Sequence, residues 1–88
     1  MKIIFHKRFV KNFKKRIKNN SSLLNRFKQR YHLFLKDKNN SILRNHQLTG
    51  DLKGKSAFSI TSDIRVIYEE KNEVVIFLDI GTHNQVYK

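Results

Sequence analysis

The sequence predicts a two-layer α+β domain in which a helical hairpin packs on one face of a small, mainly antiparallel sheet. Two observations lead to this fold class. Apolar residues repeat with the helical period of about 3.6 in the first half of the chain, and with the period of 2 typical of strands after Gly54. In addition, 88 residues with 39% hydrophobic side chains suffice for one core and no more. We therefore expect one domain, residues 1–88, with the element order β-α-α-β-β-β.

The first half of the chain predicts one short strand followed by two amphipathic helices. Lys2–His6 has the alternation of a strand. Two stripes of apolar residues at helical spacing come next: Phe9, Val10, Phe13 and Ile17, and then Leu23, Leu24, Phe27, Tyr31, Phe34 and Leu35. Lys18–Asn20 is expected to end the first helix, and Ser21 or Ser22 to cap the second. Because each helix is apolar on one stripe only, both must pack against the sheet.

The second half predicts a loop and three strands. Asp37–Asn40 interrupts the helical pattern, and Gly50 and Gly54 mark the loop. Strands are expected around Phe58 and Ile60, over Ile64–Glu69 and over Val74–Ile80, with turns at Ser62–Asp63 and Lys71–Asn72. The last of these strands is the most apolar, which fits a central position with both faces covered. Gly81 is expected to end it and to leave Thr82–Lys88 as a short tail.

Charge is the strongest signal in the composition. Nineteen Lys and Arg against seven Asp and Glu give a formal net charge of +12. Residues 1–46 carry fourteen of these basic side chains and a single acid, Asp37. A field of this size favours a polyanion or an acidic protein as partner. The alternative is a basic surface that serves solubility alone.

The composition also excludes several classes of protein. The chain has no Cys, which removes disulfides, thiolate metal sites and cysteine nucleophiles. Its longest apolar run, Val74–Leu78, is far shorter than a membrane span, and the apolar stretch within Met1–His6 is too short for a signal peptide. We therefore expect a soluble cytosolic protein that makes no membrane contact.

Three segments of the chain, taken together, resemble the RelE/ParE toxin superfamily. They are His46-x-Leu-x-Gly-x-Leu-x-Gly54, the stretch from Phe58 to Tyr68, and the stretch from Asp79 to Tyr87 with its Gly-Thr-His. Within the superfamily the chain looks most like the YafQ-like messenger-RNA interferases of bacterial toxin–antitoxin modules. The resemblance covers nearly the whole chain, including its length, its basic helical hairpin and its strand order.

The resemblance implies a function and a set of partners. Proteins of this kind have a microbial-ribonuclease type of fold and are toxins of type II toxin–antitoxin systems. They cleave messenger RNA on the ribosome, which inhibits translation, and an acidic antitoxin wraps and silences them. By resemblance we expect a ribosome-dependent endoribonuclease whose partners are the ribosome, messenger RNA and a cognate antitoxin. No cofactor and no metal is implied.

RNA cleavage without a metal needs a base for the ribose 2′-OH, an acid for the leaving 5′-O and a cation for the phosphorane. By resemblance, His83 matches the family's C-terminal histidine, which is linked to proton transfer, and His46 is a second candidate acid or base. Arg65 matches an arginine that supports the transition-state charge. The alternatives are a plain surface histidine at 83, a loop-packing or capping residue at 46, and a cross-strand ion pair of Arg65 with Glu69 or Asp79.

Asp63 and Tyr87 complete the catalytic set that the resemblance predicts. Asp63 could orient a histidine or act as a base, although Ser-Asp is also ordinary turn chemistry. Tyr87 could stack on a base or bond to a phosphate, or else pack the tail onto the sheet. Lys53 and Lys55 flank Gly54 and are predicted to contact RNA phosphates rather than to catalyse.

The chain departs from the YafQ pattern at three positions. Ser59 replaces a histidine, Ile64 an aromatic residue and Asp79 an arginine, which weakens proton transfer, base stacking and charge stabilisation in turn. Two alternatives therefore stand beside the nuclease: a ParE-like toxin that binds DNA gyrase, and a catalytically degenerate, basic RNA-binding domain. The two matching histidines and Tyr87 favour the nuclease, since a gyrase binder has no need of them.

Overall fold

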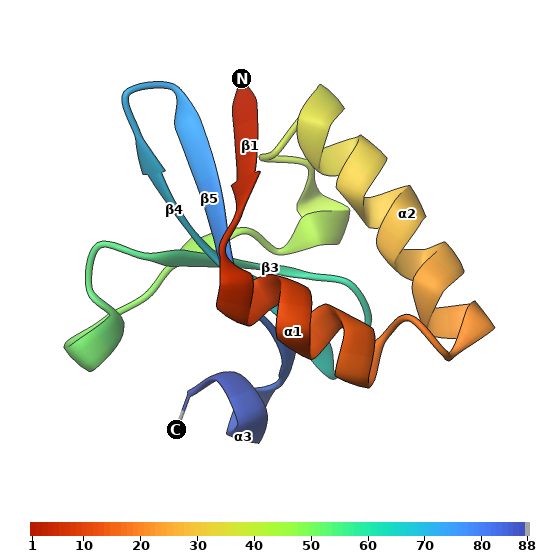
Figure 1. Ribbon diagram of the computed structural model, residues 1–88. Coiled ribbons are helices and arrows are strands. Elements are labelled where there is room, and N and C mark those ends of the chain that lie inside the picture. Colours follow the sequence, from red (N-terminus) through yellow and green to blue (C-terminus); the bar gives the residue numbers. More distant parts are fainter. Residues whose placement is uncertain (88) are drawn as a thin grey trace.

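The computed structural model describes residues 1–87 as a five-stranded sheet with two long helices on one of its faces (Figure 1). The elements are β1 Lys2–Phe5, α1 Lys7–Arg16, α2 Ser21–Lys36, β2 His46–Gln47, β3 Ser56–Ser59, β4 Ile64–Lys71, β5 Val74–Thr82 and α3 His83–Val86, with short 3₁₀ turns η1 Ser41–Leu43 and η2 Gly50–Leu52. Across the sheet the strand order is β1-β5-β4-β3-β2. Only β1 and β5 run parallel, so the predicted α+β fold with a mainly antiparallel sheet is confirmed. No helix within residues 1–87 is long and apolar enough to cross a membrane.

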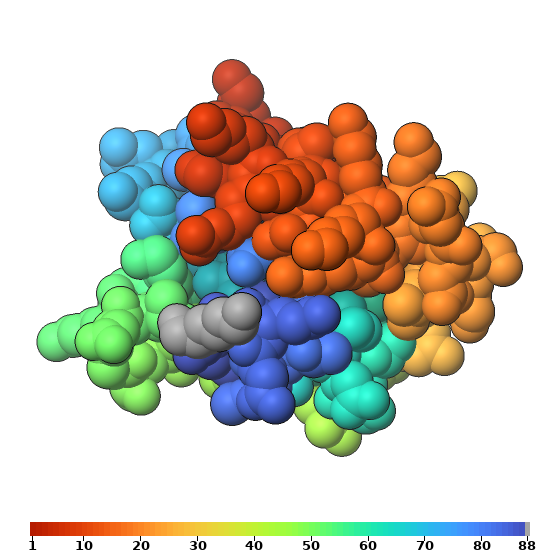
Figure 2. All heavy atoms as spheres, turned by 60° about the horizontal axis from the view of Figure 1, so that its bottom comes forward, coloured from red at the N-terminus to blue at the C-terminus, as the bar shows by residue number. Residues whose placement is uncertain are grey.

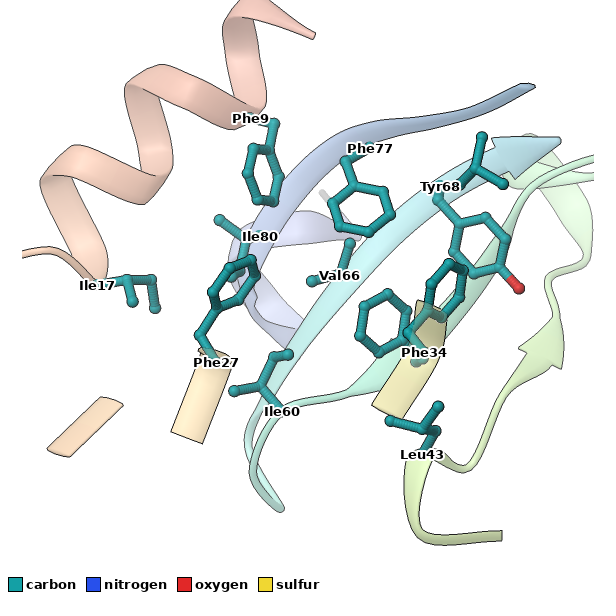
Figure 3. Packing of buried hydrophobic residues seen from close by; sticks show 12 residues of the cluster. Phe9, Ile17, Phe27, Phe34, Leu43, Ile60, Val66, Tyr68, Phe77 and Ile80 are labelled. Carbon is teal, nitrogen blue, oxygen red and sulfur yellow. The ribbon is translucent and has the colours of Figure 1, made fainter. Parts of the chain in front are cut away.

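The helices meet the sheet in a core built largely of aromatic rings. Figure 3 shows Phe9 of α1 and Phe27 and Phe34 of α2 pointing at the side chains of the sheet. Phe77 of β5 lies at the centre and is fully buried. Its ring centroid lies 5.5 to 6.5 Å from those of Phe5, Phe9, Tyr31, Phe34, Phe58 and Tyr68. The two predicted apolar stripes are thus the faces by which both helices bury aromatic surface on the sheet.

An extra residue in β5 changes which side chains face the core. β4 pairs with Phe77 and then with Asp79, so Leu78 has no partner residue in the pairing. Because of this bulge, Phe77 and Ile80 both point into the core although they lie three residues apart (Figure 3). The outer face of β5 is covered only in part, since Ile76 and Leu78 remain half-buried. The prediction that this strand is covered on both faces is therefore wrong for the outer face.

Both long helices begin at caps that differ from the predicted ones. His6, predicted as the last strand residue, is the N-cap of α1, and its Nδ1 accepts a hydrogen bond of 3.1 Å from the backbone N–H two residues later. Asn20 is the N-cap of α2, and its Oδ1 accepts from the Leu23 N–H at 3.1 Å. Ser21 and Ser22, the predicted caps, are the first two helical residues. Asn is as good an N-cap as Ser, so the sequence did not separate the two choices.

The end of the chain differs from the predicted tail. β5 continues through Gly81 to Thr82, so the glycine does not end the strand, and residues 83–86 form a single helical turn, α3. Thr82 and Gln85 form a capping box: Gln85 N–H donates to Thr82 Oγ1 at 3.4 Å, and Thr82 N–H donates to Gln85 Oε1 at 2.8 Å. The Thr-x-x-Gln spacing is the sequence signal from which this turn could have been predicted.

The connection between α2 and β2 is anchored to the sheet by a buried tyrosine. The hydroxyl of Tyr68 in β4 donates to Asn45 Oδ1 at 2.7 Å, and Asn45 Nδ2 donates to the carbonyl oxygen of Lys38 at 2.9 Å. Lys38 also forms an ion pair with Glu70. These bonds fix the backbone on both sides of η1 and therefore the position of the residues that enter β2.

We predict that Tyr68→Phe lowers the free energy of unfolding by about 1–2 kcal/mol, because Asn45 loses its partner. Burial raises the pKa of Tyr68 above its ordinary 10.0. The unfolded chain therefore loses this proton first, so the stabilisation is complete below pH 10 and falls as the pH rises further. Urea unfolding between pH 8 and 11 measures both effects. The wild type should lose stability with pH more steeply than the variant, and parallel curves would contradict the assignment.

Candidate active site

A cleft at the end of the molecule that carries α3 gathers four of the predicted catalytic residues. We call it the histidine cleft; it has a volume of about 450 Å³. It is lined by His46, Gln47, Leu48, Thr49, Asp51, Leu52, Arg65, His83 and Tyr87. Figure 2 looks onto this end, with α3 in dark blue between the glycine loop, residues 48–55, in green and the β3–β4 turn in teal. Arg65 and His83 therefore lie on the same side of the molecule, in one cleft.

The protonation of His46 is set by a backbone carbonyl. His46 begins β2 and pairs with Ala57 of β3. Its Nδ1 lies 2.9 Å from the carbonyl oxygen of Arg44. A carbonyl oxygen only accepts, so in the neutral ring Nδ1 carries the hydrogen and Nε2 is left as an acceptor. The result is a histidine that lines the cleft with one nitrogen free to take a proton.

Arg44, which no sequence motif singles out, positions that carbonyl. Its φ of 49° and ψ of 40° lie in the left-handed region, where a non-glycine side chain is strained. The residue ends η1, and its conformation turns the chain into β2, where His46 follows two residues later. Gly or Asn would signal such a turn in a sequence, and an arginine does not. Only the fold reveals the contact.

Arg65, His83 and Tyr87 form a stacked group along one wall of the histidine cleft. The Arg65 Cζ lies 5.7 Å from the centroid of the Tyr87 ring, over its face. The His83 and Tyr87 rings meet edge to face, with centroids 4.5 Å apart. The Arg65 Nε and the Tyr87 hydroxyl are buried without a hydrogen-bond partner among residues 1–87. Polar atoms buried in this way cost free energy unless a ligand supplies the missing bonds.

The turn that carries His83 is held by contacts around Gly81. Arg16 of α1 donates from Nη1 to the carbonyl oxygen of Ile80 at 2.7 Å, just before the turn. A Cβ added at Gly81 would lie 2.6 Å from Gln85 Oε1 and 2.7 Å from Arg16 Nη1. A side chain at position 81 would therefore have to displace the ends of the Gln85 and Arg16 side chains, which form the capping box of α3 and the bond to Ile80.

Three of the predicted residues lie outside the histidine cleft. Asp63 is exposed in the β3–β4 turn, where its backbone N–H donates to Thr61 Oγ1 at 3.1 Å. The structure therefore gives Asp63 the geometry of a turn residue and does not bring it to the two histidines. Lys53 and Lys55 line a neighbouring hollow on the glycine loop, whose Gly54 has a φ of +92°. Their contact with RNA remains a prediction.

The charge reversal at Asp79 is compensated inside the fold. Its Oδ1 accepts from Asn12 Nδ2 at 2.7 Å and from the Ile80 N–H at 2.8 Å, and Arg16 Nη1 lies 3.5 Å away. The carboxylate is 8% exposed and belongs to the contact between α1 and β5. Arg65 forms no ion pair with any carboxylate within residues 1–87, so neither predicted cross-strand pair is present.

Comparison with known families assigns the chain. A family model described as the bacterial toxin of type II toxin–antitoxin systems, YafQ, matches residues 1–88. The chain belongs to the YafQ family. The match spans both the basic helices and the histidine cleft, and it confirms the resemblance noted in the sequence. A search among curated proteins found no match.

Solved structures show the same fold as this YafQ-family chain. YafQ from E. coli superimposes with a TM-score of 0.77 at 21% identity, over 98% of this chain and 97% of that one. A copper-bound mutant toxin from Helicobacter pylori gives 0.77 at 28% identity, over 98% of each chain. The E. coli DinJ–YafQ complex gives 0.74 at 22% identity, with 98% and 97% coverage. Within residues 1–87 of this chain, no group of three or more His, Cys, Asp or Glu is arranged to hold a metal.

We predict that the neutral ring of His46 carries its proton on Nδ1. Nitrogen-15 NMR of the imidazoles above pH 8 distinguishes the two tautomers directly. His32 is exposed on α2, and its ring forms no hydrogen bond within residues 1–87. It serves as the internal comparison. An Nε2-protonated His46 would show that the bond to Arg44 is absent in solution.

Proposed function

We propose that this YafQ-family toxin is an endoribonuclease that cuts messenger RNA on the ribosome through attack of a ribose 2′-OH, without a metal. The observation that carries the proposal is the convergence of His46, Arg65, His83 and Tyr87 in one cleft. Two imidazoles and a guanidinium are the groups that this reaction requires, since each proton transfer and the developing charge need a positioned partner.

In this mechanism His46 is the general base. Its Nδ1 is occupied by the Arg44 carbonyl, so its Nε2 accepts the proton of the 2′-OH. His83 then acts as the general acid that protonates the leaving 5′-oxygen. The released fragments carry a 2′,3′-cyclic phosphate and a 5′-OH, and the protons balance because each histidine ends in the state from which the other began.

Arg65 and Tyr87 act on the phosphate itself. The phosphorane gains negative charge on its nonbridging oxygens, and the Arg65 guanidinium is free of any described carboxylate that would neutralise it. The Tyr87 ring contacts both the guanidinium of Arg65 and the imidazole of His83. Its buried hydroxyl, which has no partner within residues 1–87, is a donor available to a phosphate oxygen.

The partners follow from charge and from the solved relatives. The E. coli relative forms a complex with DinJ, and we propose that a cognate antitoxin with an acidic segment binds and silences this chain. The formal net charge of +12 supports binding of an acidic protein and, in its absence, of ribosomal and messenger RNA. Lys53 and Lys55, beside the cleft on the glycine loop, would hold phosphates on either side of the cut.

We predict that His83→Ala and His46→Ala each slow cleavage by about 10²- to 10⁴-fold, the usual contribution of one acid or base. His32→Ala, at an exposed site on α2, should cleave like the wild type. Cleavage is measured in a reconstituted translation reaction with purified ribosomes and end-labelled messenger RNA, and chemical analysis of the new ends should show 2′,3′-cyclic phosphate. Full activity of both variants would refute the assigned roles.

Induction of the chain in bacteria separates the nuclease from the two alternatives. We expect growth arrest together with messages cut within codons, and loss of both effects in His83→Ala. Arrest with intact messages and damaged DNA would instead identify a gyrase inhibitor. Normal growth would identify a toxin that has lost its catalytic activity.

A further inference from the structure

A second cavity, which we call the arginine cavity, lies next to the histidine cleft. It has a volume of about 180 Å³ and is lined by Arg26, Arg30, Ile42, Arg44, Ser59, Ile60, Thr61 and Ser62. These residues come from α2, from η1 and its C-cap, and from the end of β3 with the following turn. No carboxylate lines the cavity, and none of its three arginines forms an ion pair within residues 1–87.

Three arginines line one small cavity that has no carboxylate in its lining, an arrangement that costs free energy. Arg26 and Arg30 lie one turn apart on α2, and like charges at this spacing destabilise a helix. Arg44 adds a third positive charge from a backbone position in the left-handed region, where a non-glycine residue is strained. Repulsion among three cations around one small volume is relieved when an anion enters it.

The chemistry of the lining favours a phosphate over a carboxylate. A planar carboxylate is satisfied by the fork of one guanidinium, whereas the tetrahedral oxygens of a phosphate take donors from several directions. Ser62 lines the cavity beside the arginines, and no hydrogen bond within residues 1–87 occupies its hydroxyl. Thr61 Oγ1 already accepts two backbone N–H groups and still has its own proton to donate.

The arginine cavity connects to the histidine cleft at two points. Ser59 of β3 is the register partner of Arg65 in β4, so the two cavities lie on neighbouring strands. Arg44 lines the arginine cavity, and its carbonyl oxygen accepts the bond from His46. A ligand that holds the Arg44 side chain therefore also restrains the carbonyl that sets the tautomer of His46.

We propose that the arginine cavity binds a phosphate group of the RNA backbone, and that its occupation holds Arg44 and thereby positions His46 for catalysis. The second part rests on the proposed nuclease function, whereas the first part does not. The RNA strand would then be the substrate and would also position the general base His46. This is because Arg44 lines the arginine cavity and bonds to His46.

Binding is tested first, with a probe that cannot be cut. The probe is a 12-nucleotide 2′-O-methyl RNA, titrated at several salt concentrations into the wild type and into Arg26→Gln, Arg30→Gln and Lys28→Gln. Lys28 is the matched control, since it is exposed on the same helix and does not line the cavity. We expect Arg26→Gln and Arg30→Gln each to raise Kd about tenfold, and the double variant to reduce the salt slope by about 0.7, the value for one phosphate on a single strand. Lys28→Gln should change Kd less than twofold.

The chemistry of the ligand is tested by NMR with inorganic phosphate and with a poly-glutamate peptide. Phosphate should shift the arginine Nε–H signals and the amides of Ser59 and Ser62, and Arg30→Gln should abolish the shifts while the rest of the spectrum remains unchanged. If the peptide binds there and phosphate and RNA do not, the cavity is a docking site for an acidic protein and the proposal is wrong. Equal effects of Arg30→Gln and Lys28→Gln would also overturn it, because they would show a general charge effect.

Coupling to the histidine cleft is tested by cleavage kinetics. Arg26→Gln should raise KM and leave kcat unchanged, since Arg26 contacts only the phosphate. Arg44→Gln should also lower kcat, because it releases the carbonyl that positions His46. A change in KM alone for Arg44→Gln would remove the coupling. Phosphate binding that depends on the arginines in a protein without cleavage activity would reject the nuclease function and leave the binding site intact.

Discussion

The rest of the structure depends on how the backbone of β5 finds hydrogen-bond partners beyond Phe77, along the edge where β1 has ended. β1 pairs with β5 only up to that residue, and an open strand edge leaves backbone groups without partners. Beyond the end of β1, α1 and its N-cap supply the donors. The His6 N–H donates to the Phe77 carbonyl oxygen at 2.9 Å, and Arg16 Nη1 donates to the Ile80 carbonyl oxygen at 2.7 Å. The same contacts fix the end of β5 from which α3 and its histidine continue. The position of α3 and of His83 therefore depends on how this edge of β5 is covered.

Charged and polar groups in this molecule fall into two sets that behave differently. Asp79, Asn12 and Arg16 satisfy one another between α1 and β5 and serve the fold. Arg65 and Tyr87, by contrast, keep buried polar atoms without partners in the described chain. Polar groups that satisfy one another stabilise the fold. Buried polar atoms without partners lower its stability and are available to a ligand. The unsatisfied atoms collect at the same end of the sheet as the exposed histidines.

The three departures from the family pattern each have a structural role in this chain. Ile64 packs against the hydrophobic core at the start of β4. Asp79 takes part in the contact between α1 and β5, as described above. Ser59 lines the arginine cavity and pairs with Arg65 across the sheet. A loss measured against the family pattern is therefore not by itself a loss of function, because the neighbouring residues differ as well.

The sequence by itself determined the fold class, the two helices and the residue types of the site. Hydrophobic periodicity and the spacing of Gly50 and Gly54 are local properties, and both glycines adopt the positive φ that the loop requires. Family resemblance supplied His46, Arg65 and His83, which the fold brings into one cleft.

Only the tertiary structure decided which of these groups meet and in what state. The bulge at Leu78 moves Asp79 off the core face, and the carbonyl oxygen of Arg44 sets the tautomer of His46. Neither contact leaves a pattern in the sequence. Asp63 has the right residue type and lies in a turn away from the cleft. The physical reason is the same in each case: distances between residues far apart in sequence come from packing, and packing is not encoded in any single segment.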